Sequence, residues 1–383
     1  MVKSHLIMKT AGHHNISILS LCLLSVLFGC SSDSPQFSVD KTCQIVITPQ
    51  FYAVKDFKQG LAVIKIGDEI LSKQGFIDLQ GKMCIPPKFD EVHEFSEDLA
   101  VVRIGDESSG KYGFIDRQGK NVITPQFFFV GDFTNGLALM RDGDEFVGKY
   151  GFIDKRGKKV IAPKFDAENS FKEDLAAIRV GDAISGKWGF IDKIGTEIIS
   201  PQFDFANDFS EGLALIRKGT DKSGKWGFID KQGKIVIDLQ FDYAESFKDG
   251  LAIIRIGDKT KGKWGVIDKQ GKMVIPPQFD KESAFSEGLA AIRIGDPLTG
   301  KWGFIDKQGK IVIPPKFHLA GNFSEGLAAV LIGDGITGKW GFIDKQGRMV
   351  ITPQFDLAGK FSQGLAPVRI GDETTGKWGF ISK

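Results

Sequence analysis

The sequence predicts an all-β protein made of nine 38-residue repeats, each with three antiparallel strands. The first observation is a glycine that recurs every 38 residues between Gly75 and Gly379. The second is that runs of β-branched and apolar residues alternate with turns rich in glycine, aspartate and proline, as short strands and their connections do. The third is the composition: 42% hydrophobic residues and 47 glycines among 383 are typical of a folded protein full of tight turns. The repeat favours one continuous body over the two or three domains that this length would otherwise suggest.

The strands and turns of one repeat can be followed along residues 289–317. Three strands are expected at Leu289–Ile294, Trp302–Asp306 and Ile311–Ile313, because each is rich in aromatic or β-branched residues. The turn between the first two contains Gly, Asp, Pro and Thr. The hairpin turn before the third strand places Gly309 where a positive φ is needed. Two prolines follow Ile313 and are expected to end the third strand, since proline cannot donate to a β-ladder.

A longer connection leads from each repeat to the next and carries phenylalanine at two fixed positions. Because one large aromatic side chain can bury roughly 150–250 Å², we expect both positions to form the core between repeats. The first position is Phe51, Phe89, Phe127, Phe165, Phe203, Phe241, Phe279, Phe317 and Phe355, and the second is Phe57, Phe95, Phe133, Phe171, Phe209, Phe247, Phe285, Phe323 and Phe361.

All six tryptophans occupy one repeat position, and Gln74, Tyr112 and Tyr150 occupy it in the earliest copies. One interpretation is a stacking column for glycans or bases. The other is a structural aromatic spine, which we favour because a ligand site rarely needs every copy of a repeat to be the same. The tryptophans are Trp188, Trp226, Trp264, Trp302, Trp340 and Trp378.

The order of the strands leaves two architectures open. The chain begins with a strand of the third type at Ile45–Ile47 and ends with strands of the first and second types between Leu365 and Ile381. This complementarity is what a closed propeller-like ring needs, and closure removes exposed strand edges. Propellers usually have four to eight blades of four strands, and Phe37–Lys41 resembles a decayed second strand that would cap an open array. An open β-solenoid or superhelical array therefore stays as the alternative.

The first 30 residues differ from the rest of the chain. Lys3 and Lys9 precede an apolar run, Ile16–Phe28, that is too short to span a membrane and is typical of a signal peptide. The run ends in Leu27-Phe-Gly-Cys30, which resembles a bacterial lipoprotein signal; that resemblance implies that Cys30 is lipidated and becomes the mature N-terminus. The alternative is an ordinary signal peptide with an incidental cysteine. The predicted organisation is a signal peptide at 1–29, a lipidated tether at 30–36 and a repeat domain at 37–383.

The charge and the remaining cysteines narrow the function further. The net charge is +2, from 50 basic and 48 acidic residues that are interspersed, so the body lacks the positive footprint of a nucleic-acid or anionic-lipid binder. Cys43 and Cys84 remain in the body at different repeat positions. A disulfide between them is conceivable in an oxidising compartment but is not what we expect.

No catalytic, cofactor or metal residues are expected. Gly257–Lys263 matches the spacing of a phosphate-binding loop, but Trp264 replaces the required Ser or Thr and the spacing recurs in other repeats, so it predicts a hairpin turn. His93 and His318 are the only histidines in the body, and no His/Cys metal spacing is present. The recurrent aspartates and arginines, such as Asp306 and Arg293, are expected on exposed strand faces in cross-strand pairs.

The repeated Lys-Trp-Gly-Phe-Ile-Asp-Lys-Gln-Gly-Lys, followed by Ile-Pro-Pro-Gln-Phe-Asp, resembles the bacterial WG-repeat (KWG-repeat) family over about residues 39–383. The earliest copies depart from it at Gln74 and Cys43. The resemblance implies β-rich repeats in bacterial, often exported proteins, and it carries no catalytic residues across.

These observations predict a non-enzymatic repeat lipoprotein at the bacterial envelope, on the outer membrane or cell surface rather than the inner membrane. Its partner would be a protein or a glycan, bound at the variable turns and connections such as Asp296–Thr299. The alternatives are a purely structural envelope component and a hydrolase that uses His93 or His318.

Overall fold

The computed structural model describes residues 43–68, 71–144 and 147–383. The chain divides into two compact units, Met1–Ser38 and Val39–Lys383, and the second contains every described residue. The predicted signal peptide, tether and lipidation site at Cys30 lie outside the described residues. The described part of the chain consists of strands and turns, and it holds no helix that could span a membrane.

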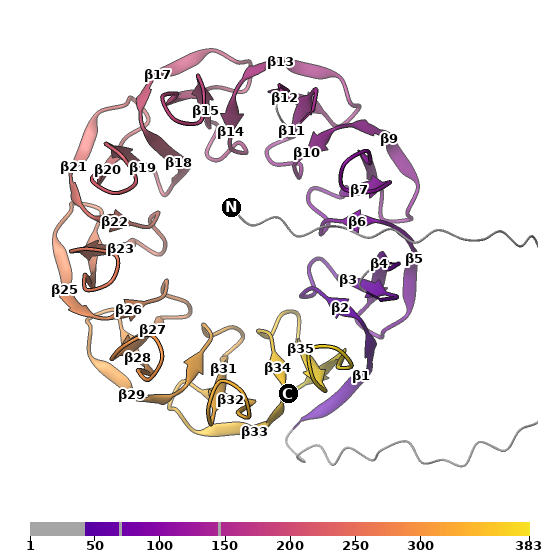
Figure 1. The fold of residues 1–383 in the computed structure, drawn as a ribbon, viewed down its shortest axis with the longest axis vertical. Helices are drawn as coiled ribbons and strands as arrows, with labels where there is room; N and C mark the ends of the chain where they lie inside the picture. The colour runs from indigo at the N-terminus through magenta and orange to yellow at the C-terminus, as the bar shows by residue number, and fades with distance from the viewer. Residues whose placement is uncertain (1–42, 69–70, 145–146) are drawn as a thin grey trace, which may run out of the picture. The chain divides into compact units, whose positions relative to one another are not determined.

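The second unit is a nine-bladed β-propeller of four-stranded antiparallel sheets. In each blade the strands run from the inside of the ring to its rim, as β26 to β29 do in Figure 1. Blades 1 to 3 are β2 (Ala53–Val54), β3 (Leu61–Ile66), β4 (Lys73–Asp78) and β5 (Met83–Phe89); β6 (Glu91–Val92), β7 (Ala100–Ile104), β8 (Lys111–Ile115) and β9 (Asn121–Phe127); and β10 (Phe129–Val130), β11 (Leu137–Asp142), β12 (Lys149–Asp154) and β13 (Lys159–Phe165). Blades 4 to 6 are β14 (Ala167–Glu168), β15 (Ala176–Val180), β16 (Lys187–Ile191) and β17 (Glu197–Phe203); β18 (Phe205–Ser210), β19 (Leu213–Lys218), β20 (Lys225–Ile229) and β21 (Ile235–Phe241); and β22 (Tyr243–Ala244), β23 (Leu251–Ile256), β24 (Lys263–Asp268) and β25 (Met273–Phe279). Blades 7 to 9 are β26 (Lys281–Glu282), β27 (Leu289–Ile294), β28 (Lys301–Asp306) and β29 (Ile311–Phe317); β30 (Leu319–Ala320), β31 (Leu327–Ile332), β32 (Lys339–Asp344) and β33 (Met349–Phe355); and β34 (Leu357–Ala358), β35 (Leu365–Ile370), β36 (Lys377–Ser382) and β1 (Gln44–Phe51).

Each blade therefore has one strand more than the sequence predicted. The additional strand is the innermost one, and in eight blades it is only two residues long, as β26 is. It forms inside the longer connection that leads from each repeat to the next. A pair of residues is too short to show an alternating pattern, so the sequence could not reveal it.

The outer strand continues through the prolines that were expected to end it. β29 runs to Phe317, and its register against β28 shifts on either side of Phe304. The shift is a bulge, and an edge strand with a bulge tolerates proline because fewer of its N–H groups face a partner. Position 303 has no room for a side chain. A Cβ added to Gly303 would lie 2.4 Å from the Ile313 carbonyl oxygen and 2.6 Å from the Pro315 nitrogen. The glycine of each repeat thus lets the bulged outer strand cross close to its neighbour.

The ring alternative is confirmed, and the open array is wrong. β1 pairs antiparallel with β36, from Gln44 opposite Ser382 onward, so the two ends of the chain complete blade 9 (Figure 1). The closing joint repeats the contacts of the internal joints: the Ser362 hydroxyl donates to the Phe57 carbonyl at 2.6 Å, as Ser286 does to Phe323 at 2.7 Å.

The core lies between adjacent blades, as the phenylalanine pattern predicted. The second phenylalanine position is buried in all nine repeats, and the first is buried in every repeat except at the half-buried Phe127. Rings from neighbouring blades meet across every joint except the one between blades 6 and 7, where Val266 replaces the phenylalanine; Phe304 and Phe323, for example, have centroids 4.9 Å apart. The same contact closes the ring, between Phe57 and Phe380 at 4.8 Å.

The cross-strand pairs that we expected for the recurrent aspartates and arginines form in blade 2, where Arg103 pairs with Glu91 on the neighbouring strand at 3.0 Å, but not in blade 7. In blade 7 Asp306 lies opposite Leu289, and Arg293 lies opposite Trp302. The Asp306 carboxylate instead accepts hydrogen bonds from the backbone N–H groups of Gln308 and Lys310 and caps the hairpin turn. Gly309 in that turn has φ +80°, as predicted.

The two cysteines of the body do not form a disulfide. Cys43 is buried in the core between blades 8 and 9, whereas Cys84 is exposed on β5 of blade 1.

Candidate functional site

The six tryptophans do not stack directly on one another. Trp188 and Trp264 are buried, and the other four are partly exposed. An inner-strand residue of the next blade lies beside three of the indoles: Phe205 beside Trp188, Tyr243 beside Trp226 and Lys281 beside Trp264. The identity of this inner-strand position varies around the ring: it is aromatic at Phe129, Phe205 and Tyr243, and elsewhere it is Ala53, Glu91, Ala167, Lys281, Leu319 or Leu357.

Five aromatic rings form a continuous series across blades 4 to 6, which we call the aromatic ladder. Its successive centroids are 5.9, 5.2, 5.7 and 5.4 Å apart. The rings meet edge to face or tilted, the arrangements that their quadrupoles favour. Sequence reasoning identified the tryptophans but missed the two inner-strand members, because only three blades are aromatic at their position. The ladder consists of Trp188, Phe205, Trp226, Tyr243 and Trp264.

A groove of about 740 Å³ lies at the end of this ladder and spans blades 5 to 7; we call it the ladder groove. It opens on the side of the ring that carries the turns between the second and third strands of each blade, such as residues 257–262. Its lining consists of the aromatic residues Trp226, Tyr243 and Trp264, the basic residues Arg255, Lys259, Lys281 and Arg293, the acidic residues Asp221, Asp242 and Asp280, and Thr260 and Pro297.

All three carboxylates of the ladder groove are neutralised by cations outside its lining. Asp221 pairs with Arg217. Asp242 pairs with Lys225 at 2.6 Å and accepts the Gly257 N–H at 2.8 Å; burial works against ionisation, but these bonds keep its pKa below the usual range. Asp280 pairs with Lys263 at 2.5 Å, and that hydrogen bond lowers its pKa in the same way.

The basic residues of the groove are in the opposite situation. Within the described ranges, Arg255, Lys259, Lys281 and Arg293 form no ion pair. The Arg255 guanidinium sits between two rings of the ladder, 5.7 Å from the Tyr243 centroid and 5.6 Å from that of Trp264. Its Nε is buried without a hydrogen-bond partner. The Lys281 ammonium lies 4.0 Å over the Trp264 ring, so both cations are held by aromatic faces.

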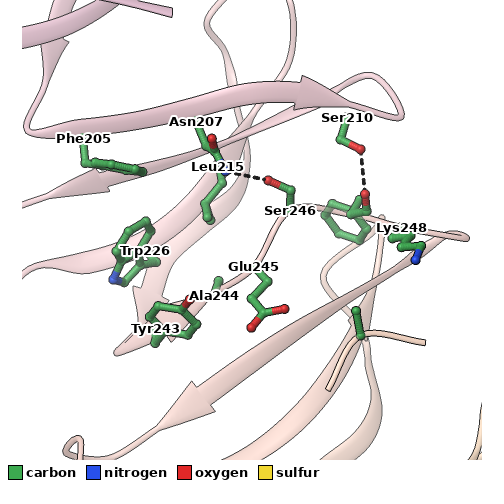
Figure 2. Close-up of a pocket in the computed structure, with 12 residues that line it drawn as sticks. Phe205, Asn207, Ser210, Leu215, Trp226, Tyr243, Ala244, Glu245, Ser246 and Lys248 are labelled. Carbon is green, nitrogen blue, oxygen red and sulfur yellow. Dashed lines mark hydrogen bonds between the residues drawn. The ribbon is translucent and has the colours of Figure 1, made fainter. Parts of the chain in front are cut away.

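A smaller hollow of about 440 Å³ shares Trp226 and Tyr243 with the ladder groove and lies between the inner strands of blades 5 and 6. Figure 2 shows Phe205, Trp226 and Tyr243 at one end, with Glu245 between them and Lys248. The Asn207 amide donates to the Ser246 hydroxyl at 3.1 Å, and the Ser210 hydroxyl donates to the Phe247 carbonyl at 2.7 Å (Figure 2). These bonds tie blade 5 to blade 6. The Glu245 carboxylate has no hydrogen-bond partner among the described residues.

A second carboxyl group near Glu245 is fully enclosed. Glu282 on β26 is 1% exposed, and neither of its oxygens has a hydrogen-bond partner. Burial, and then the charge of Glu245, raise the pKa of Glu282 to about 8. Burial also raises the pKa of Glu245, against the effect of Lys281. Glu282 is therefore protonated at neutral pH.

The structure does not bring together the residues considered for a hydrolase. His93 lies in blade 2, where Asp132 at 2.8 Å and Glu91 at 3.5 Å raise its pKa to about 9. His318 follows β29 at the start of blade 8, far along the ring. Among the described residues no group of three or more His, Cys, Asp or Glu side chains could hold a metal ion.

The segment that resembles a phosphate-binding loop is a hairpin turn, as predicted. The Gly262 N–H donates to the Asp258 carbonyl at 2.9 Å. The N–H groups of Thr260 and Lys261 donate to the Asp258 carboxylate at 2.8 and 2.7 Å. The backbone donors that would cradle a phosphate are therefore used within the turn.

Comparison with known protein families gives a match to the family described as WG containing repeat, once for each of nine segments. The chain belongs to the WG-repeat family. The matched residues are 39–69, 75–107, 112–146, 150–182, 188–222, 226–259, 264–296, 302–335 and 340–378. No curated protein matches the chain.

Solved structures resemble this WG-repeat ring in fold alone. A crystal structure described as that of the eukaryotic initiation factor has a TM-score of 0.57 at 12% identity, covering 79% of this chain and 87% of that one. An acylaminoacyl peptidase from Pyrococcus horikoshii has a TM-score of 0.40 at 11% identity, covering 74% of this chain and 58% of that one. The β-propeller domain of the trilobed protease from Pyrococcus furiosus has a TM-score of 0.40 at 10% identity, covering 70% of this chain and 99% of that one.

Proposed function

We propose that this WG-repeat propeller is a non-enzymatic binding module of the bacterial envelope, and that a protein or glycan partner occupies the ladder groove. The observation that carries the proposal is the position of the groove at the turns and inner strands where the repeats differ most. Lys259, Thr260 and Pro297 come from the turns, and Tyr243 and Lys281 come from the inner strands. Concave sites lined by aromatic side chains and a few polar groups are the usual form of ligand sites.

The repeated part of each blade serves the ring itself. The phenylalanines fill the joints, the glycine admits the outer strand, and the aspartate caps the hairpin turn. Residues with these duties cannot vary without weakening a joint. A specific surface is therefore best placed on the positions that vary, as loops on a rigid scaffold are.

Membrane attachment is part of the proposal. The apolar run before Cys30 and the cysteine itself support a lipid anchor, with the outer membrane or cell surface as the location. An anchored ring would hold its groove close to envelope polymers and proteins. The second candidate is a purely structural envelope component. That function would not require an open groove lined by aromatic and basic side chains.

Site-specific photo-crosslinking in the living bacterium tests this function. A photoreactive residue replaces Lys259 in the groove or, as a control, Glu373, which occupies the same exposed turn position in blade 9. We expect a defined adduct from position 259 and none from position 373. Equal labelling at both positions, or none at either, would contradict a partner site in the groove.

A further inference from the structure

We propose that the ladder groove binds an acidic glycan, a sugar chain that carries carboxylate or phosphate groups. The inference rests on the proposed binding function and specifies the ligand of that same groove. It starts from charge: the three carboxylates that line the groove are each matched by Arg217, Lys225 or Lys263. The four basic side chains of the lining have no such partner, so the groove carries an excess of positive charge although the whole chain is nearly neutral.

Arg255 is the best-prepared anion ligand in the groove. Tyr243 and Trp264 hold its guanidinium from two sides, so little side-chain freedom is lost when an anion binds. Arg217, one blade earlier, is held by Phe205 and Trp226 in the same way but is already paired with Asp221. Arg255 is therefore held between two aromatic rings as Arg217 is, but no carboxylate of the described chain pairs with it as Asp221 pairs with Arg217. Guanidinium pairs with carboxylate or phosphate through charge-assisted hydrogen bonds.

The neighbouring cations extend the site from Arg255 across two blades. Arg293 occupies the same repeat position in blade 7, and Lys281 lies beside Trp264 between the two blades. Lys259 stands on the turn above Arg255. A ligand with several anionic groups along its length can engage these cations together. Glu245, whose charge interacts with that of Lys281, lines the smaller hollow and not the ladder groove.

The polar groups of the groove favour a glycan over a peptide. A peptide needs main-chain partners, but the turn amides donate to Asp258, and the Gly257 N–H donates to Asp242. The inner strands there are two residues long and offer little edge for strand addition. The Tyr243 hydroxyl has no hydrogen-bond partner among the described residues and can bond a sugar hydroxyl. The aromatic side chains beside it can stack on a sugar ring, because the C–H groups of the sugar's apolar face are attracted to the negative face of an aromatic ring.

Calorimetric titration of the full chain in detergent tests the assignment. The probes are a hexagalacturonate, a phosphorylated mannan oligosaccharide, a neutral maltohexaose and a hexaglutamate peptide. We expect at least one of the two acidic saccharides to bind, the neutral one to bind much more weakly, and the affinity to fall with added salt. Arg255→Gln should weaken binding about tenfold. Arg369→Gln is the matched control, because Arg369 has the same repeat position and a buried, unpartnered Nε but lies in blade 9, outside the groove.

Each other outcome overturns the acidic-glycan assignment. Tighter binding of hexaglutamate makes the ligand an acidic peptide, and equal binding of maltohexaose makes charge irrelevant. If neither acidic saccharide binds, or if Arg369→Gln weakens binding as much as Arg255→Gln, the groove is not their site. The crosslink from position 259 reports a bound partner of any chemistry. If the crosslink forms while the glycan assignment fails, the groove is still a binding site, but for a different ligand.

Discussion

Glu282 and Val266 depart from the repeat together, at the joint between blades 6 and 7. In seven of the other eight blades the position of Glu282 is filled by alanine or valine, and such a residue clusters with the phenylalanine at the position of Val266, as Ala244 does with Phe228; blade 4 has Glu168 at this position but keeps Phe152. At this joint the phenylalanine is reduced to Val266 and the small residue is enlarged to Glu282. This joint has no Phe–Phe ring contact among the described residues, and the Glu282 carboxyl is buried beside it without a hydrogen-bond partner.

This exchange makes the stability of the ring depend on pH. The pKa of Glu282 is about 8 in the folded protein, against an ordinary value of 4.5. As pH rises, the unfolded chain loses this proton first, so stability falls between about pH 4.5 and 8. Glu282→Gln cannot titrate, and the wild type should lose up to about 4 kcal/mol relative to it across that window. Urea unfolding of both proteins at several pH values measures the difference. Parallel pH profiles would show that the pKa of Glu282 is not raised in the folded protein.

The joint that closes the ring should contribute as much to the stability of the protein as any internal joint. Phe380 and Phe304 are both fully buried, and each meets a phenylalanine of the next blade. Phe380→Ala and Phe304→Ala should each destabilise the protein by about 3–5 kcal/mol. Chemical denaturation compares the two variants. A clearly smaller effect of Phe380→Ala would mean that the ring opens at blade 9 before it unfolds.

The close approach of the outer strand predicts that Gly303 tolerates no side chain. Gly303→Ala would place a Cβ 2.4 Å from the Ile313 oxygen, and the backbone has to shift to admit it. We expect a loss of about 3 kcal/mol. At Gly321 the nearest atom to an added Cβ is 3.6 Å away, so Gly321→Ala is the control, with an expected change below about 0.5 kcal/mol. Similar melting temperatures for the two variants would refute the steric argument.

The tryptophans should contribute unequally to stability, because the ladder covers only part of the ring. Trp264 is 7% exposed and contacts Tyr243, whereas Trp302 is partly exposed and has no aromatic neighbour among the described ring contacts. Trp264→Ala should cost about 3 kcal/mol, and Trp302→Ala about half of that. Equal losses in thermal unfolding would show that the ladder adds nothing to the repeated contacts of the indole.

The proposed lipid anchor is tested by substitution of Cys30. If Cys30 is acylated, Cys30→Ala should abolish incorporation of radiolabelled palmitate and release the protein from the membrane fraction. Cys84→Ala is the matched control, because Cys84 is exposed on blade 1 and should leave labelling unchanged. Retained label in the Cys30→Ala protein would rule out lipidation at this residue.

Much of this architecture could be predicted from the repeat itself. The 38-residue period, the strands around Trp302, the turn at Gly309 and the two buried phenylalanine positions all follow from local residue patterns. Such patterns repeat because each blade faces the same neighbours on both sides. The innermost strands and the bulge at the prolines were missed, since the first are too short to show a period and the second depends on pairing with Gly303.

Other features were decided only in three dimensions. Ring and superhelix differ by a small rotation between neighbouring repeats, which no single repeat encodes, and the pairing of β1 with β36 settles it. The candidate site likewise depends on how neighbouring repeats are arranged in space. Tyr243 and Lys281 are ordinary variations in their own repeats, and Arg255 is a recurrent residue; they become a groove because three blades meet there. The sequence alone determined the unit and its core, because those depend on contacts that recur in every copy. The tertiary structure decided the closure and the groove, because both depend on how unlike residues from neighbouring copies come together.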